Sequence, residues 1–569
     1  MSPTPIRNIP VNNDLPINSI HVISQHWGLI LALLAFIIWN ALLIFAHLKK
    51  NTGFQYTDLE LTALAMGGWP LPALLFSFII LFLSAFIPAG FILVIAAAII
   101  LSSGWLAVRT IWENTSAWAL APVLIFLLFA FLRLGFVANL LMPLYFDSAE
   151  HYRIIQELLA IGNEANRTWP TTSYYHLGYH AIIAALTIIT SAEPSQIMLL
   201  FGQLILAAIP LPIYFLIHRA TFSRSAAILG VTLAAFGWFM PAHAVNWGKY
   251  PALLSLSLIQ FAFGIAILKK RWMFALTALA AMLIHTRSMI LLVMLGAAWF
   301  LSFAWEKQDR NKRIISFGLT VTLLGLLIVL VFRNQILSPI LDPYLIWVTL
   351  LTGLLAAAVF QAFPHLVIFP ILAILFMLAG IFIPVTSSLT LLDRPLVEMV
   401  LFLPLAFLGG LGSVRLPKFA TSILAVLIIV NAWMTISFAP SKCCQLVSQD
   451  DSTALNWMER HIPKDAVIAI AGVDLNVNAF GRPMRGAGID AGIWIKPLTK
   501  NETLALPNTT DFASTEAHDL LCRNGVTHIY VGERPQSFSP DFAEMVPEWY
   551  ETIFSLPKTH IVKVLNCGK

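Results

Sequence analysis

The sequence has few charged residues. Asp, Glu, Lys and Arg together make up 11% of its 569 residues, whereas 59% are hydrophobic. Ordinary globular domains carry about 25% charged and about 45–50% apolar residues, so this composition excludes a soluble enzyme and a disordered chain. The net charge of +5 is small for this length, and no block of Lys and Arg suggests nucleic-acid binding. The mean hydropathy of +0.81 indicates a polytopic membrane protein.

Cysteine is also scarce, and its four positions all lie near the C-terminus: Cys443, Cys444, Cys522 and Cys567. Cysteines confined to one soluble segment favour an oxidising compartment, although chance placement is the alternative. A disulfide from Cys443 or Cys444 to one of the other two would pin the ends of this segment together. A bond between the adjacent Cys443 and Cys444 is less favourable because its geometry is strained.

Long apolar runs dominate the rest of the chain. A membrane-spanning helix needs about 20 mostly apolar residues. The first run follows Arg7 and a polar tail without the pattern of a cleavable signal, so we expect it to be retained. The predicted spans are 28–47, 70–87, 89–108, 118–138, 179–191, 196–217, 225–241, 250–268, 272–285, 288–304, 314–333, 345–361, 366–384, 396–413 and 419–437.

These runs predict a mainly α fold, a polytopic transmembrane helical bundle with a small extracytoplasmic C-terminal α/β domain. We expect N-terminal transmembrane helices in 1–117, a transmembrane core in 118–438 that includes a polar outer loop at 139–178, and the α/β domain in 439–569. Alternating patterns in the last part predict some parallel strand pairing. The helices are predicted at 451–460 and 515–524, and the strands at 466–471, 526–531 and 561–565.

Basic loops predict the orientation. Lys269 to Arg271, Lys307 to Arg313, and Arg415 with Lys418 should face the cytoplasm, which places the C-terminal domain outside a plasma membrane. Lys49, Lys50 and Arg109 then place the loop 139–178 outside as well. Four apolar segments lie between this loop and Lys269, where an odd number of crossings is required. One of the four therefore fails to cross. The short segment 179–191 is the first candidate, but the sequence leaves the choice open.

The outer loop opens with three ionisable side chains, Asp147, Glu150 and His151, directly after an apolar span. Residues 152–161 have the apolar spacing of an amphipathic helix lying in the membrane interface. Asp147 with Glu150 three residues later fits a capping box. Asp147 is thus either a helix cap or a catalytic general base, and the two roles are compatible because a cap fixes the carboxylate in place.

Further polar side chains lie at the expected outer helix ends, where ionisable groups are by default functional candidates. The alternatives are an aromatic belt for the Tyr and His cluster and ordinary loop charges, the latter most credible for Asp393. The guanidinium groups of Arg287 and Arg394 suit phosphate, and Glu398 could simply be the ion-pair partner of Arg394. The candidates for substrate binding are Tyr175, His176, His180, His243, Lys249, His285, Arg287, Arg394 and Glu398.

Taken in order, these motifs resemble the GT-C superfamily of membrane glycosyltransferases, which includes protein mannosyltransferases, aminoarabinose transferases and oligosaccharyltransferase catalytic subunits. The likeness covers most of residues 118–569, and each motif alone is loose. It is carried by Phe146-Asp147-Ser148-Ala149-Glu150, by the run from Tyr174 to His180, by Asp393-Arg394-Pro395, and by the C-terminal phrases at 454–458 and 524–532.

The resemblance implies inverting transfer of a sugar from a polyprenyl-phosphate-linked donor to a protein, glycan or lipid acceptor of the cell envelope. It implies Asp147 as the general base, with Glu150 and His151 beside it. Arg394 would bind the lipid phosphate, and Arg287 or Lys249 would assist. Two departures are that three predicted spans precede the usual first one and that residues 238–251 contain no acid.

The second departure bears on a metal, because a hard cation such as Mg²⁺ or Mn²⁺ wants several oxygen ligands. The sequence leaves open a divalent cation held by Asp147, Glu150 and His151.

Two other classes of protein are alternatives. A transporter or lipid flippase without glycosyl transfer predicts repeated halves and charged or broken helices at the bilayer midplane. The sequence has no internal repeat, and its ionisable residues cluster at outer helix ends. A scaffold that recruits partners through its C-terminal domain predicts instead that Asp147 can be replaced without consequence.

Overall fold

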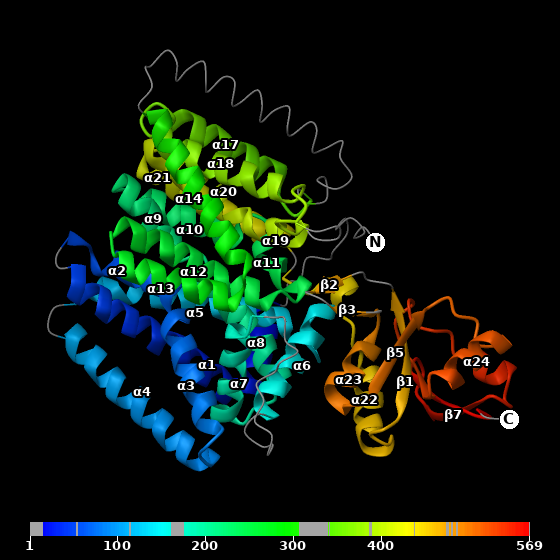
Figure 1. Ribbon diagram of the computed structural model, residues 1–569. Coiled ribbons are helices and arrows are strands. Elements are labelled where there is room, and N and C mark those ends of the chain that lie inside the picture. Colours follow the sequence, from blue (N-terminus) through cyan, green and yellow to red (C-terminus); the bar gives the residue numbers. More distant parts are fainter. Residues whose placement is uncertain are drawn as a thin grey trace.

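The computed structural model describes residues 15–52, 55–112, 115–160, 176–306, 340, 342–385, 390–436, 438–473, 477–479, 482–484 and 487–567. Within these ranges a large helical part is followed by a smaller domain built on a β-sheet (Figure 1). The predicted span 314–333, the basic loop from Lys307 to Arg313 and Tyr175 lie outside the described residues.

The helical part contains the following helices: α1 (Leu15–Thr52), α2 (Asp58–Gly68), α3 (Pro70–Ser84), α4 (Ala89–Trp112), α5 (Ala121–Leu134), α6 (Phe146–Ala160), α7 (Gly178–Thr190), α8 (Pro194–Ala208), α9 (Pro212–Thr221), α10 (Arg224–Phe236), α11 (Phe239–His243), α12 (Tyr250–Ile267), α13 (Arg271–Ile284), α14 (Arg287–Glu306), α17 (Ile346–Val359), α18 (Pro364–Gly380), α19 (Arg394–Val400), α20 (Phe402–Gly412) and α21 (Lys418–Thr435). Seven described helices are long and apolar enough to cross a membrane, or eight if the bent pair α2–α3 counts as one span. This pattern suggests a multi-pass membrane protein.

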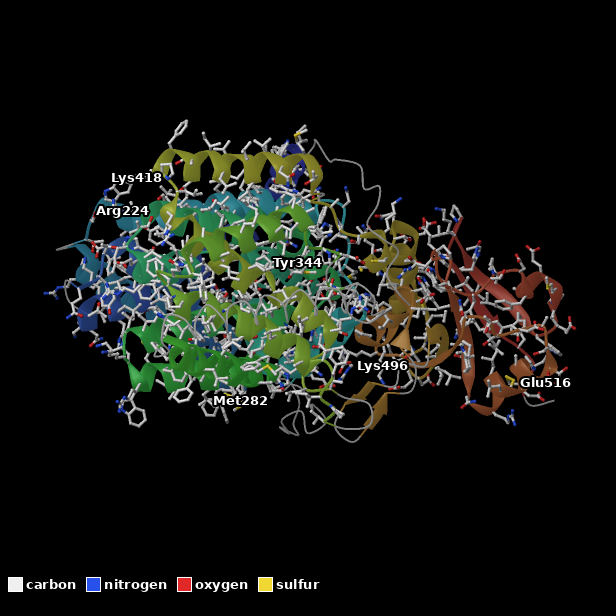
Figure 2. All side chains as sticks on the ribbon, turned by 90° about the horizontal axis from the view of Figure 1, so that it is seen from above. Arg224, Met282, Tyr344, Lys418, Lys496 and Glu516 are labelled. Atoms are coloured by element: carbon white, nitrogen blue, oxygen red, sulfur yellow. A yellow bond between two sulfur atoms is a disulfide. The ribbon has the colours of Figure 1, made fainter. Side chains whose placement is uncertain are left out.

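The helical part has two chemically different ends. We call the end beside α6 and the sheet domain the site end, and the end at which Lys269 to Arg271 lie the basic end. Lys249 precedes α12 and Lys269 follows it, so this helix of 18 residues separates the two ends by about 27 Å. In Figure 2, Arg224 and Lys418 lie at the basic end, far from Glu516 in the sheet domain.

Helix α7 does not connect these two ends. His180, near its start, contacts His151 of α6 at 3.0 Å, and Glu193, just after its end, accepts a hydrogen bond of 2.5 Å from Tyr152 of α6. Both ends of α7 therefore lie beside α6. From there to Lys269 the chain runs between the two ends three times, along α8–α9, along α10 and along α12. Of the four apolar segments between the loop and Lys269, segment 179–191 is the one that does not run between the two ends.

Most helices pack around one continuous apolar core, but α4 and α21 leave most of their surface uncovered. Only 17% of the apolar window of each is buried inside the protein. Their exposed side chains are large and apolar, for example Trp105 on α4 and Phe419 on α21. Such faces are unfavourable in water, because they leave a large contiguous apolar area unburied. They fit helices that face lipid.

The amphipathic helix predicted at 152–161 exists as α6 and begins earlier, at Phe146. Its apolar residues Ile155 and Leu158 are 0% and 2% exposed and belong to the protein core. The apolar face of α6 is therefore covered by protein, chiefly α7, and is not left for the membrane interface.

The C-terminal domain confirms the predicted elements. Its sheet contains β1 (Val467–Val473), β4 (Ala487–Gly488), β5 (Glu502–Pro507), β6 (Val526–Val531), β7 (Tyr550–Ser555) and β8 (His560–Val564). Strand β1 pairs in parallel with β5 and β6, whereas β8 pairs antiparallel with β6 and β7. The other elements are α22 (Gln449–His461), α23 (Ile495–Thr499), α24 (Thr515–Arg523), α25 (Phe542–Met545) and the hairpin of β2 (Val477–Ala479) and β3 (Arg482–Met484). Strands β5 and β7 are not among the strands predicted from the sequence.

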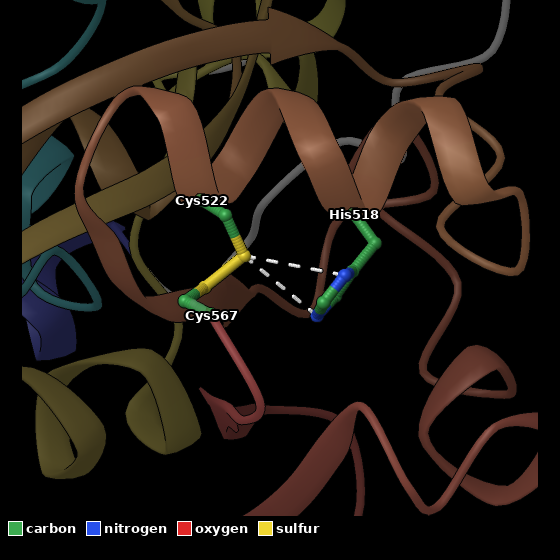
Figure 3. Close-up of side chains that lie close together, drawn as sticks. All are labelled: His518, Cys522 and Cys567. Atoms are coloured by element: carbon green, nitrogen blue, oxygen red, sulfur yellow. Dashed lines mark hydrogen bonds between the residues drawn. A yellow bond between two sulfur atoms is a disulfide. The ribbon is translucent and has the colours of Figure 1, made fainter. Parts of the chain in front are cut away.

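The disulfide prediction was wrong in its partners. Cys522 at the end of α24 is bonded to Cys567 after β8 (Figure 3). Cys443 and Cys444 are free. The fold gives the reason. Strand β6 follows α24 directly and pairs with β8, which brings Cys522 and Cys567 to a Cα separation of 5.1 Å. Cys444 lies instead at the start of the domain, where its carbonyl accepts a hydrogen bond from the Tyr145 amide.

Replacing Cys522 with Ser should lower the free energy of unfolding of the sheet domain by about 2–4 kcal/mol, because the bond closes a loop of 45 residues. Pulse proteolysis of the purified full chain in increasing urea measures this loss. Cys443→Ser is the matched control and should leave the transition unchanged. Recovery of Cys522 and Cys567 as alkylated free thiols under non-reducing conditions would contradict the assignment.

Candidate functional site

Four charged side chains from distant segments meet at the site end, and we call them the charge cluster. Asp147 comes from α6, Lys249 from the turn before α12, Arg287 from the start of α14, and Asp393 from the residue before α19. Lys249 Nζ lies 3.2 Å from Asp147 Oδ2 and also 3.2 Å from Asp393 Oδ2. Arg287 Nη1 lies 2.7 Å from Asp393 Oδ1. Lys249 therefore joins the two carboxylates into one network.

The capping box predicted for Asp147 is not formed. Because α6 begins at Phe146, Asp147 lies inside the first turn, and its carboxylate contacts Lys249. Glu150 does not reach back to the helix start either, because it pairs with Arg153 at 2.6 Å. A carboxylate in the first turn is still favourable, since it faces the positive end of the helix dipole. With 34% of its side chain exposed, against 24% for Asp393, Asp147 is the more open of the two acids.

Gly248 allows Lys249 to approach α6. Its φ is +64°, in the left-handed region that favours glycine. A Cβ atom at this position would lie 2.7 Å from Ser148 Oγ and 2.8 Å from the Leu144 carbonyl oxygen. Any larger residue would push the turn away from α6 and draw Lys249 away from Asp147.

Four histidines lie next to the charge cluster as two pairs. The rings of His176 and His285 are perpendicular with centroids 5.2 Å apart, and His151 Nδ1 lies 3.0 Å from His180 Nε2. Burial, together with the positive charges of Lys249 and Arg287, lowers the pKa of His151 and of His285 to about 3 and that of His176 to about 4. At neutral pH these three side chains are uncharged.

Asp393 remains ionised. Burial by itself would raise the pKa of this carboxyl, but the charges of Lys249 and Arg287 outweigh the effect and hold the pKa below its ordinary value. The charge cluster thus holds two acids against two cations. Such a network can exchange one anionic partner for another without leaving a cation unpaired.

Several predicted site residues lie apart from the cluster. His243 contacts Asn246 at 3.0 Å. Arg394 makes none of the ion pairs of the cluster; its charge acts instead on Glu398, whose buried side chain lies inside the helical part. Conversely, Asp393, for which an ordinary loop charge was the most credible expectation, is part of the charge cluster. The only available signal was its place beside Arg394 in the Asp393-Arg394-Pro395 motif.

The geometry does not support a divalent cation on Asp147, Glu150 and His151. The carboxylate of Glu150 is paired with Arg153, and the carboxylate of Asp147 is paired with the ammonium of Lys249. Among the described residues, the one trio of His, Cys or acidic side chains with ligand atoms within 4.8 Å of one another is His518, Cys522 and Cys567 (Figure 3). Its two sulfur atoms are bonded to each other and so offer no thiolate.

The sheet domain contacts the opposite side of α6 from α7 (Figure 1). The Tyr145 amide donates a hydrogen bond of 2.9 Å to the Cys444 carbonyl, and the Tyr152 and Trp494 rings lie 5.6 Å apart. The cluster therefore lies near the junction of the helical part and the sheet domain, where both could contact a bound substrate.

No protein-family model and no curated protein matches the sequence.

The buried neutral histidines should make stability depend on pH. Their native pKa values lie below the ordinary value of 6.5. As the pH falls below 6.5, these histidines therefore bind protons in the unfolded chain but not in the native state. Stability is then fully present above about pH 6.5 and is lost as the pH falls toward 4. We expect the melting temperature of the purified protein to drop over this range.

His285→Gln should make that drop shallower, since one of the titrating groups is removed. The control is His461→Gln, which changes an exposed histidine on α22. A pH profile of melting temperature that is identical in wild type and His285→Gln would rule out the contribution of His285.

Proposed function

We propose that the protein is a membrane glycosyltransferase of the GT-C type, which transfers a sugar from a polyprenyl-phosphate-linked donor to an acceptor at the site end. The observation that carries the proposal is the charge cluster. An open carboxylate, Asp147, and two cations suited to phosphate, Lys249 and Arg287, come from distant segments to one end of an apolar helical bundle. A donor with a lipid tail needs such a bundle, because its tail must remain in the membrane.

The two cations suit the leaving group, which is the lipid phosphate. Arg287 offers a planar fork of donors and Lys249 a compact point charge, and both types of side chain bind phosphate. Both are already held by acidic partners in the cluster. An incoming phosphate would take over as their partner. The role that the resemblance implies for Arg394 therefore passes to Arg287 in this proposal.

Asp147 would act as the general base. In the absence of donor its carboxylate is tied to Lys249, and binding of phosphate to Lys249 would release it. The acceptor oxygen then attacks the anomeric carbon from the face opposite the phosphate. The bond between that carbon and the phosphate oxygen breaks with its electron pair, Asp147 takes the acceptor proton, and the configuration inverts. Catalysis is then mainly positioning and charge stabilisation.

The neutral histidines would contact the sugar. His176 and His285 lie beside Arg287, and uncharged imidazoles can donate or accept hydrogen bonds to hydroxyl groups without competing for the phosphate. His151 and His180 are more deeply buried behind Asp147 and would hold α6 and α7 together.

The site end should face away from the cytoplasm. Lys49 at the end of α1, Arg219 at the end of α9, Lys269 after α12 and Arg415 after α20 lie at the basic end. Lys and Arg are enriched in cytoplasmic loops. The charge cluster and the sheet domain would then be extracytoplasmic in the plasma membrane, where the acceptor, a protein, glycan or lipid of the cell envelope, is found.

Asp147→Asn should abolish transfer, with a loss of about 100-fold or more, because the amide cannot take the acceptor proton. The assay uses membranes that contain the full chain and a panel of labelled polyprenyl-phosphate hexoses, and it follows release of polyprenyl phosphate. The matched control is Asp58→Asn, which breaks a similar pair with Lys49 (3.0 Å) at the basic end and should keep activity within a few-fold.

Two outcomes of this assay contradict the proposal. Transfer by Asp147→Asn within a few-fold of wild type would remove the base. The flippase alternative would be favoured if the wild type consumes no donor in the panel but moves the labelled polyprenyl-phosphate lipid across the bilayer.

Arg287→Ala should raise the KM for the donor by about 10-fold or more with a smaller effect on kcat, because a charged hydrogen bond to the phosphate is lost. Arg287→Lys should restore part of the affinity by returning the charge without the fork. Arg415→Ala, which changes an exposed arginine at the basic end, is the control. An unchanged KM in Arg287→Ala would exclude a phosphate contact at this residue.

A further inference from the structure

A second site of distinct chemistry lies at the opposite end of the helical part. A cavity of about 590 Å³ opens between α9, α12, α14, α18 and α20, within the range of ligand-binding pockets. Its walls are almost entirely aliphatic and aromatic; Phe263, Trp299, Phe369 and Met377 are typical. None of the charge-cluster residues lines it.

Two cations lie at its rim, Arg219 at the end of α9 and Lys269 after α12. The Arg219 guanidinium stacks over the Tyr56 ring, 4.7 Å from the ring centroid, which fixes its position without neutralising its charge. Lys269 is exposed. In the part of the chain that the structure describes, no acidic side chain pairs with either cation.

The depth of the cavity fits a single acyl chain. Along α12 its lining runs from Leu256 to Lys269, which corresponds to about 20 Å at 1.5 Å per residue. One leaflet accounts for about half of a hydrocarbon core about 30 Å thick. The cavity therefore extends from the basic end slightly past the middle of the bilayer and stops short of the charge cluster.

We propose that this cavity binds an anionic membrane phospholipid from the leaflet at the basic end. Its phosphate contacts Arg219 and Lys269, and one acyl chain fills the apolar space between the helices. Basic pockets between transmembrane helices recognise anionic head groups in this way. The charge complementarity favours an anionic lipid over a zwitterionic one, whose own cationic group would be repelled by the rim. This proposal does not depend on the glycosyltransferase proposal.

The test is native mass spectrometry of the full chain titrated with phosphatidylglycerol and with phosphatidylcholine of identical acyl chains. We expect the wild type to bind the first about tenfold or more tightly than the second. The double variant Arg219→Gln, Lys269→Gln should lose this preference. Its matched control, Arg415→Gln with Lys418→Gln, also removes two cations at the basic end, outside the cavity lining, and should keep the preference.

A second variant tests the apolar part without changing charge. Ala266 lies one helical turn before Lys269, is exposed and lines the cavity. Ala266→Trp should therefore block entry of the acyl chain and weaken binding of both lipids. Equal binding of the two lipids by the wild type, or an unchanged preference in the Arg219 and Lys269 variant, overturns the proposal. Undiminished lipid binding by Ala266→Trp, or displacement of the lipid by millimolar inorganic phosphate, overturns the acyl-chain assignment.

Discussion

The site end depends on the ammonium group of Lys249, which is held between the carboxylates of Asp147 and Asp393. Charged groups at the end of an apolar bundle are costly unless each has a partner. With Arg287 on Asp393, this requirement brings together the start of α6, the turn before α12, the tip of the α13–α14 hairpin and the start of α19. Four connections that could otherwise vary independently are thereby fixed to one another.

The two ends of the helical part differ in how their charged side chains are arranged. Acids and cations in balance, with neutral histidines around them, form a polar centre at the site end. At the basic end, Arg219 and Lys269 lie at the rim of an apolar cavity, and no acidic side chain among the described residues pairs with either. The first arrangement suits exchange of one anion for another, and the second suits permanent attraction of an anionic surface.

Much of this architecture could be predicted from local pattern. Apolar runs located most helices, and the strands β1, β6 and β8 follow from short apolar stretches beside turn residues. The site was harder, because its partners are tertiary. Nothing near Asp147 indicates that Lys249 will replace a capping bond, and nothing near Asp393 distinguishes it from a loop charge. Arg394, one residue on, has its charge next to Glu398 and not in the cluster. The Cys522–Cys567 bond likewise depends on the pairing of β6 with β8.

The contact between the Tyr145 amide and the Cys444 carbonyl has a consequence for sequence divergence. Both partners are main-chain atoms, so the attachment of the sheet domain beside α6 survives replacement of either side chain. If the proposed function is correct, related chains could exchange the loops of this domain, and with them the acceptor that they bind, while the proposed base Asp147 on α6 keeps its position. Acceptor specificity could then diverge without a change in the proposed reaction.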